Sequence, residues 1–425
     1  MLEMQKKLTN LFYAVLSLPA TAMGFALSIQ ISALSWIMTT QYGLDLHEIG
    51  IVWAAGPLAG IIGQPIVGLI SDNVWFWGGR RRPFIFIGAT LAALMLLALP
   101  NLGAISSFFG IGSIVFVATV VALTLDLAIN ISFNPTRSII ADVTPEGTTR
   151  TMGYTWMQTI SGTFGVLAYA IGAYFGNFVL IYFGVGLVFV FSIIPMLFIK
   201  EKRVLNTAEE NKIDQETGRD KTDWNQFMKV LFAHSFSWIG VQTMFVYIIG
   251  YITQYLSPAD DNETGQIIAI SFLILNAVGA VLPATILEPV TEKIGRVKTH
   301  LMCVAVMSAA YFGIVFFGKT VTSLYILMSV AGIGWAAIVS LPFAIMSEKV
   351  AKSRMGFFMG IFNLSVVLPQ LFVSLVLGYF INNAADKNLI FIISGTTLAI
   401  SAVLWFLVKD SKAMKAELSQ VGAGH

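Results

Sequence analysis

Twelve apolar segments, each long enough to cross the roughly 30 Å hydrocarbon core of a bilayer, dominate the chain. Soluble domains carry about 25% charged residues, whereas 11% of these 425 residues are charged and 56% are hydrophobic. A backbone that spans a bilayer must satisfy its own hydrogen bonds, which favours helices. The sequence therefore predicts an all-α, multi-pass membrane protein with twelve transmembrane helices. The segments lie near residues 11–40, 48–71, 83–101, 108–140, 152–175, 178–200, 226–256, 265–289, 299–318, 321–347, 356–382 and 388–408.

One long polar connection divides the twelve segments into two sets of six. The loop after the second segment, GLISDNVWFWGGRRRPF, and the loop after the eighth, LEPVTEKIGRVKTH, both place an acid at a helix end and then a Gly-Arg turn. Two pseudo-symmetric six-helix bundles joined by a polar linker describe the major facilitator fold. The predicted parts are an N-terminal six-helix bundle at 1–200, a cytoplasmic linker at 201–224, a C-terminal six-helix bundle at 225–410 and a cytoplasmic tail at 411–425.

The positive charges predict the orientation of these bundles. With both termini in the cytoplasm, nearly all of the 25 Lys and Arg residues face the cytoplasm, and only Lys319 and Lys387 lie in outer loops. Such an excess is typical of cytoplasmic loops. The N-terminus resembles a signal peptide, but its apolar run continues to about Thr40, so we expect a retained first helix. The expected location is the cytoplasmic (inner) membrane, in contact with its lipids.

Several classes of function are not supported by the sequence. The single cysteine, Cys303, cannot form an internal disulfide, and no group of side chains has the spacing of a metal site. No basic patch of the kind that binds nucleic acid is present. No nucleophile, base and orienting residue come together, so we expect a protein that is not an enzyme and uses no cofactor.

One acidic residue, Asp126, lies near the middle of the fourth apolar segment. At about 100° per residue it shares a helix face with Asn130, Phe133 and Arg137. The step from Asp126 to Arg137 spans about 16 Å, too far for an ion pair unless Pro135 bends the helix sharply. A membrane-embedded acid without a partner tends to hold a proton, so we predict that Asp126 is the proton-coupling residue. The alternative is an acid that only bonds neighbouring helices together.

A charged cluster is predicted at the cytoplasmic ends of the second, third and fourth segments. We expect its acids to pair with its arginines and to hold a cytoplasmic gate closed. The alternative is that the arginines only fix the orientation of the chain, or reach harmlessly to the membrane interface. The candidate gate residues are Asp72, Arg80, Arg81, Arg82, Arg137 and Asp142.

Amides and aromatic residues recur within the apolar segments. Amides and carboxylates bond sugar hydroxyls, and flat aromatic faces pack against the C–H surfaces of a sugar. An amide-rich pocket with one acid therefore fits an uncharged polyhydroxy substrate. For any single amide, the alternative is a hydrogen bond between helices. The candidate substrate-binding residues are Asp126, Asn130, Gln30, Gln158, Tyr154, Trp238, Gln242, Asn276 and Asn363.

Several stretches resemble the sucrose-transporter group of sugar–cation symporters in the major facilitator superfamily, which is related to the glycoside-pentoside-hexuronide cation symporters. They are MGFALSIQIS, AGPLAGIIGQPIVGLISD, GRRRPFIFIGA, LDLAINISFNPTRSIIADV, GYTWMQTISGTFGVLAYAIGAY and GWAAIVSLPFAIMSEKV. The resemblance implies proton-coupled uptake of sucrose, maltose or a related α-glucoside by a monomer. It also implies that Asp126 takes the proton and contacts the sugar.

The sequence departs from the pattern of that group at two places. The seventh segment keeps Trp238 but has Ile248, Ile249 and Gly250 where the group has acids, and the first segment has Ser28 at the group's glutamine position, with Gln30 two residues on. The short tails and compact loops fit a bacterial member better than a plant one. Sodium in place of the proton is left open. The rival interpretations are an exporter of small hydrophobic compounds on the same fold and a sugar sensor that binds without transport.

Overall fold

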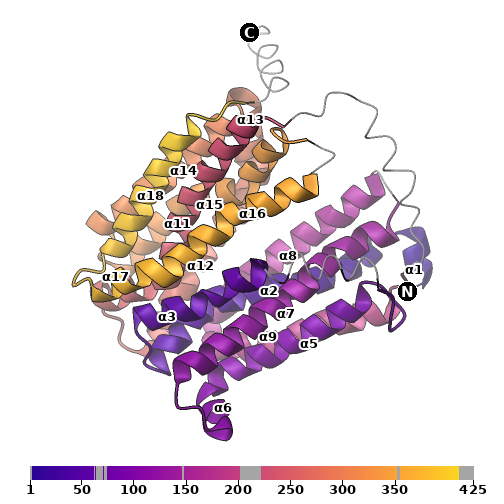
Figure 1. Ribbon diagram of the computed structural model, residues 1–425, viewed down its shortest axis with the longest axis horizontal. Coiled ribbons are helices and arrows are strands. Elements are labelled where there is room, and N and C mark those ends of the chain that lie inside the picture. Colours follow the sequence, from indigo (N-terminus) through magenta and orange to yellow (C-terminus); the bar gives the residue numbers. More distant parts are fainter. Residues whose placement is uncertain are drawn as a thin grey trace. The chain divides into compact units, whose positions relative to one another are not determined.

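The computed structural model describes residues 2–61, 63, 70, 74–145, 148–201, 222–351 and 355–410 (Figure 1). Within these residues the regular secondary structure is helical, apart from one isolated β-bridge between Phe76 and Gly79. Nine of the described helices are long and apolar enough to cross a membrane, and two shorter apolar helices are Leu46–Ile61 and Leu389–Trp405. Each of the twelve predicted segments overlaps a described helix, which confirms the all-α membrane fold. Asp72, most of the predicted linker and the predicted tail lie outside the described residues.

The chain forms two compact units. Unit 1 consists of Met1–Leu205 with Ala259–Ile270, and unit 2 of Asn206–Pro258 with Ser271–His425. Within unit 1, α2 packs against α8 and α9, while α5 packs against α7 and α9 (Figure 1). The helices are α1 (Leu2–Lys7), α2 (Asn10–Thr40), α3 (Leu46–Trp53), α5 (Arg82–Ala98), α6 (Leu102–Phe109), α7 (Ile114–Val143), α8 (Thr148–Phe175) and α9 (Asn177–Phe198).

Unit 2 repeats the same packing pattern. Its first long helix, α11, packs against α16 and α18, while α14 packs against α15 and α18. Each half therefore pairs its first helix with its fifth and sixth, and its third with its fourth and sixth. The helices are α11 (Trp224–Tyr255), α12 (Asp261–Leu282), α13 (Glu288–Ile294), α14 (Arg296–Phe317), α15 (Val321–Ser347), α16 (Met355–Phe372), α17 (Gly378–Asn383) and α18 (Leu389–Trp405). π-helical turns at Pro283–Leu287 and Val373–Leu377 join α12 to α13 and α16 to α17.

One predicted boundary is wrong. The fourth segment was expected to start at residue 108, but the third helix continues through a 3₁₀ turn (Leu99–Asn101) into α6 and ends at Phe109. Pro100 lies in the first turn of that 3₁₀ stretch, where its missing N–H costs no hydrogen bond. The helix stops at Gly110, which adopts the left-handed conformation (φ +66°) that glycine tolerates best.

Local signals set several helix starts. Thr9, Ser113 and Asp223 each accept a hydrogen bond from the backbone N–H three residues later, at 3.2, 3.3 and 3.0 Å. Asp45 and Thr320 each form a reciprocal capping box with the residue three positions on. These side chains satisfy backbone donors that a helix N-terminus leaves open. The starts of α2, α3, α7, α11 and α15 therefore follow from their own short-range sequence.

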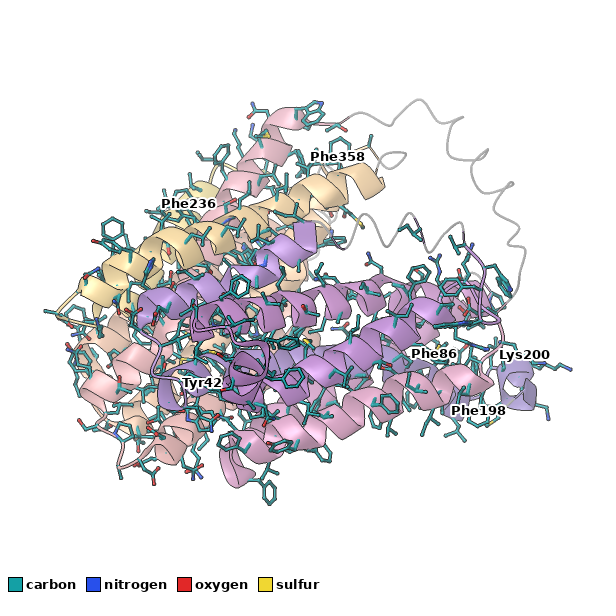
Figure 2. The ribbon with its side chains drawn as sticks, turned by 60° about the horizontal axis from the view of Figure 1, so that its bottom comes forward. Tyr42, Phe86, Phe198, Lys200, Phe236 and Phe358 are labelled. Atoms are coloured by element: carbon teal, nitrogen blue, oxygen red, sulfur yellow. The ribbon has the colours of Figure 1, made fainter. Side chains whose placement is uncertain are left out.

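Apolar clusters hold together one end of each unit. In unit 1 the cluster includes Phe12, Leu16, Ile85, Ile140 and Met196, and in unit 2 the corresponding cluster surrounds Phe227, Phe358 and Trp405. Figure 2 shows Phe86, Phe198 and Lys200 at one end of unit 1 and Tyr42 at the opposite end. The start of α5 and the end of α9 therefore meet at the same end, which is the end predicted to face the cytoplasm.

Candidate functional site

Asp126 lies in the middle of α7 and is buried, with 6% of its surface exposed. Its partner is the side-chain amide of Gln30 on α2, whose Nε2 donates to Asp126 Oδ2 at 2.9 Å. Gln30 is itself buried, with 4% exposed. None of the ion pairs between described residues includes Asp126. The acid thus faces a neutral amide, and nothing in the described part of unit 1 compensates its charge when it is ionised.

Glycines bring the second transmembrane helix close to this acid. A Cβ at Gly56, within the apolar helix Leu46–Ile61, would lie 3.2 Å from Asp126 Oδ2. A Cβ at Gly63 would lie 3.3 Å from the Cβ of Asn130. These distances are shorter than ordinary van der Waals contacts. A side chain at either position would push against α7, whereas glycine fits without displacing it. The backbone at Gly56 therefore forms one wall of the Asp126 site.

Asn130, Arg137 and Tyr154, the other predicted residues of α7 and α8 with described contacts, bond or stack on groups other than the Asp126 carboxyl. Asn130 donates to the backbone carbonyl of Asp126 at 2.8 Å, within its own helix. The Arg137 guanidinium lies over the Phe133 ring, 4.0 Å from its centroid, and α7 continues through Pro135, so Arg137 stays distant from Asp126 along the helix. The Tyr154 hydroxyl donates to the Arg137 carbonyl at 3.3 Å. Gln158 lies on an exposed face of α8.

Unit 2 gathers a second set of polar and aromatic side chains. The Trp335 indole N–H donates to Asn276 Oδ1 at 3.1 Å, and the Trp335 ring packs edge-on against Phe245 and Trp238, with centroid distances of 5.3 and 6.2 Å. Asn276 also donates to the Phe272 carbonyl at 2.9 Å. An amide and two indole rings from α11, α12 and α15 therefore share one region of unit 2.

Sequence reasoning missed Trp335, which lies in an apolar stretch without a neighbouring charge. The available signal was its place within GWAAIVSLPFAIMSEKV, the stretch that resembles a known group. His234 was missed as well. Its Nε2 accepts a hydrogen bond from the Trp238 indole at 2.9 Å, and its ring stacks on Phe362 at 4.9 Å. The i, i+4 spacing of His234 and Trp238 on one helix could have indicated this pair.

Two of the remaining candidates in unit 2 lie near this set. Gln242 is buried and accepts a hydrogen bond from Gln370 Nε2 at 3.3 Å, so its contact is a bond between α11 and α16. Asn363 lies half-buried on α16, directly after Phe362. An amide hydrogen bond of this kind joins helices, and a role of Gln242 in substrate binding stays a prediction.

The predicted gate residues Arg80, Arg81 and Arg82 lie at the end of unit 1 that is predicted to face the cytoplasm. Arg80 and Arg81 both bond Asp142 Oδ2, at 3.0 and 3.1 Å, and the side chain of Asp142 is 9% exposed. The Arg82 guanidinium donates to the Ile199 carbonyl at the end of α9. Among the described residues, the contact of the Arg137 guanidinium is with the Phe133 ring and not with Asp142.

Glu201, which sequence reasoning missed, completes this cluster. Its carboxylate accepts hydrogen bonds from the backbone N–H groups of Arg80, Arg81 and Arg82 at 2.7, 2.8 and 2.9 Å. These donors lie at the N-terminus of α5, where a helix favours an anion. The residue before it, Lys200, is held by Gln5 through two hydrogen bonds of 2.8 and 3.1 Å.

Unit 2 has the counterpart of this arrangement. Asp410 accepts from the backbone N–H of Val297 in the first turn of α14 at 3.1 Å, and Gln226 accepts from the backbone N–H of Lys409 at 2.8 Å. Arg296 pairs with Glu348 at the end of α15, as Arg80 and Arg81 pair with Asp142. The signal in the sequence is a Lys-acid pair after the sixth and twelfth segments, FIKE and LVKD.

Comparison with known proteins places this architecture in a family. The Major Facilitator Superfamily model matches residues 16–374 and, in a second match, residues 231–423. The chain therefore belongs to the Major Facilitator Superfamily, and it is a transporter rather than an enzyme. The xylose transporter XylE from E. coli, solved in an inward-open conformation, superposes with a TM-score of 0.69 over 96% of this chain and 98% of that one, at 14% identity. That likeness confirms the fold.

Two relatives of known name are similar to the chain in sequence. The sucrose transport protein SUC4 of Arabidopsis thaliana is 24% identical over 417 residues, which cover 84% of this chain and 81% of that protein. The general alpha-glucoside permease of Schizosaccharomyces pombe is 29% identical over 174 residues, which cover 37% of this chain and 31% of that protein.

Proposed function

We propose that the protein takes up an α-glucoside disaccharide of the sucrose or maltose class together with a proton, by alternating access across the cytoplasmic membrane. The observation that carries the proposal is a buried acid, Asp126, bonded to a neutral amide in the middle of a transmembrane helix. Buried acids of this kind mark ion and proton paths in transporters. The similarity to a sucrose transport protein and an alpha-glucoside permease supports the substrate class.

In the proposed cycle, Asp126 carries the proton. Protonation removes a charge that burial disfavours, and the neutral carboxyl can both donate to and accept from sugar hydroxyls. Release of the proton on the cytoplasmic side leaves a carboxylate that Gln30 stabilises with its N–H. Alternating access then moves the site between the two faces of the membrane, as in other transporters built from repeats.

The Trp335–Asn276 pair is the second proposed contributor to substrate binding. An indole presents a flat apolar face and a polar edge, and an amide offers both donors and acceptors. In this pair the indole N–H fixes the orientation of Asn276, whose Nδ2 bonds its own helix. The pair fits a polyhydroxy ring better than a hydrophobic drug, which would need a larger apolar surface.

At the cytoplasmic end, we propose that Asp142 with Arg80 and Arg81 belongs to a gate. Both guanidinium groups bond one carboxylate, and Glu201 fixes the backbone that carries them. The ends of α5, α7 and α9 are thereby tied into one rigid group that can move as a unit. Asp72, the other predicted gate acid, lies outside the described residues.

The substrate class is tested by counterflow in proteoliposomes loaded with unlabelled sucrose or maltose. We expect labelled sugar of at least one kind to enter faster than it enters protein-free liposomes. Binding of sugar without exchange would support the sensor instead. Neither binding nor exchange, together with expulsion of a hydrophobic dye, would support the exporter.

Replacing Gly56 by Ala is expected to slow uptake roughly three- to tenfold, because the new Cβ at 3.2 Å displaces the Asp126 carboxylate by a few tenths of an ångström. Gly60→Ala is the matched control, since a Cβ at Gly60 meets no atom within 4 Å. The measurement is the initial rate of labelled-sugar uptake at equal protein levels. Equal uptake rates for the two variants would contradict the claim that Gly56 forms one wall of the Asp126 site.

Replacing Trp335 by Phe is expected to raise the half-saturation sugar concentration about fivefold, the effect of losing one hydrogen bond of about 1 kcal/mol. The ring is retained, but the donor to Asn276 is removed. Trp224→Phe is the control, because Trp224 is half-exposed at the start of α11. If the two variants have the same half-saturation concentration, Trp335 has no part in binding.

A further inference from the structure

We propose that Gln30 is a positioning residue that sets the pH at which Asp126 gains and loses its proton, rather than a ligand of the sugar. The inference rests on the proposed function, in which Asp126 carries the proton. It changes the role that the sequence predicted for Gln30, and it is carried by the geometry of the Gln30–Asp126 pair.

The pair joins two helices inside unit 1. Gln30 comes from α2 and Asp126 from α7, and these helices pack against each other. The amide donates to one carboxylate oxygen at 2.9 Å, and both side chains are more than nine-tenths buried. Little water reaches this buried hydrogen bond to compete for its donor and acceptor. The bond therefore holds the carboxyl group in a fixed place.

Several other titratable side chains on the helices packed against α7 bond groups other than the Asp126 carboxyl. Arg82 of α5 bonds the Ile199 carbonyl, Glu48 of α3 caps its own helix, and the Tyr154 hydroxyl of α8 bonds the Arg137 carbonyl. On α7 itself, Arg137 stacks on Phe133 and Asp142 bonds two arginines. The other titratable residues on these helices are Tyr13, His47, Arg150, Tyr169 and Tyr174.

Among the described residues, Gln30 therefore makes the side-chain hydrogen bond to the Asp126 carboxyl. A donor to a carboxylate stabilises the ionised form, whereas burial stabilises the neutral form. Gln30 opposes part of the effect of burial and lets the proton leave at a lower pH than an apolar neighbour would.

The amide is suited to both protonation states of Asp126. Its NH₂ group donates to a carboxylate, and its carbonyl oxygen accepts from a carboxylic acid after the amide turns over. Gln30 can thus hold the Asp126 carboxyl in one position through the transport cycle. A leucine of similar size keeps the packing but provides neither bond.

The test is a pH titration of the protonated carboxyl band by infrared spectroscopy on the purified full-length protein, with Asp126→Asn to assign the band. For Gln30→Leu we expect the midpoint to move up by about one pH unit, because a hydrogen bond to a charged group is lost. Gln242→Leu is the matched control, since Gln242 is equally buried but bonds the neutral Gln370. Its midpoint is expected to equal that of the unchanged protein.

An unchanged midpoint in Gln30→Leu would overturn the inference, and an equal shift in Gln242→Leu would do the same. If Gln30→Leu does not fold, Gln30→Asn replaces it, because the shorter amide cannot reach at 2.9 Å and should move the midpoint in the same direction. The titration uses no sugar, so it decides the role of Gln30 even if counterflow shows that the proposed substrate class is wrong.

Discussion

Replacing Asp126 by Asn is expected to abolish accumulation of sugar against its gradient while exchange of sugar across the membrane continues. Asparagine keeps the size and the hydrogen-bonding atoms of the acid but cannot carry a proton. Without a bound proton, a pH gradient cannot favour entry of the sugar over its exit. The internal sugar concentration should therefore fall to about the external one. The measurement compares accumulation with counterflow in the same proteoliposomes.

Asp386→Asn is the control for this result. Asp386 lies in the loop between α17 and α18, and the Tyr255 hydroxyl that donates to it lowers the pKa of its carboxyl. A group whose pKa is lowered stays ionised at neutral pH, so Asp386 carries no proton through the cycle. Accumulation should persist in this variant. Sugar accumulation by Asp126→Asn at the level of the unchanged protein would remove Asp126 from the mechanism.

Replacing Asp142 by Ala is expected to be the most destabilising single change at the end of unit 1 that is predicted to face the cytoplasm. It leaves the guanidinium groups of Arg80 and Arg81 without their carboxylate, and these side chains are 16% and 8% exposed. Removing one partner of a buried ion pair costs about 3–5 kcal/mol. We expect the thermal unfolding midpoint of the purified protein, followed by circular dichroism, to fall by several degrees.

Glu348→Ala provides the matched comparison in unit 2. Its partner Arg296 is 38% exposed and Glu348 is 23% exposed, so solvent screens the pair. Exposed pairs of this kind contribute about 1 kcal/mol or less, and the unfolding midpoint should change little. An equal loss of stability in the two variants would show that burial does not distinguish the two ion pairs.

Hydropathy predicted the helices well because the bilayer imposes one strong constraint on every segment. The sequence singled out Asp126 because an isolated acid in an apolar run is costly, and the structure places it buried against Gln30; its role in proton coupling stays a prediction. The boundary between the third and fourth helices was placed wrongly, because the third helix continues through a 3₁₀ turn at Pro100 into α6. That continuation depends on how the turn packs, which the local sequence does not specify.

The partners of single side chains could not be predicted. Gln30 and Asp126 are 96 positions apart, and Trp335 and Asn276 are 59 positions apart. Such pairs depend on helix rotation and crossing, which hydropathy leaves undetermined. Gln30 was therefore assigned to the sugar, although its amide bonds the acid, and Trp335 was overlooked because one tryptophan in an apolar run resembles a packing residue.

The similarity between the two halves extends beyond the loops that follow the second and eighth segments. In each unit a glutamine holds the backbone of a lysine after the sixth helix, and the following acid caps the third helix. The triple arginine made the loop in the first half conspicuous, while the short motifs FIKE and LVKD carried the rest of the repeat. Glu201 and Asp410 are the acids of these two matched motifs.

The central claim is tested most directly by accumulation of labelled sucrose and maltose in proteoliposomes, with and without an inward-directed pH gradient. At one proton per sugar, each pH unit of gradient should drive about tenfold accumulation of the transported sugar. A protonophore should abolish this accumulation and leave counterflow intact. Equal accumulation with and without the gradient, with sodium absent, would contradict proton coupling through Asp126.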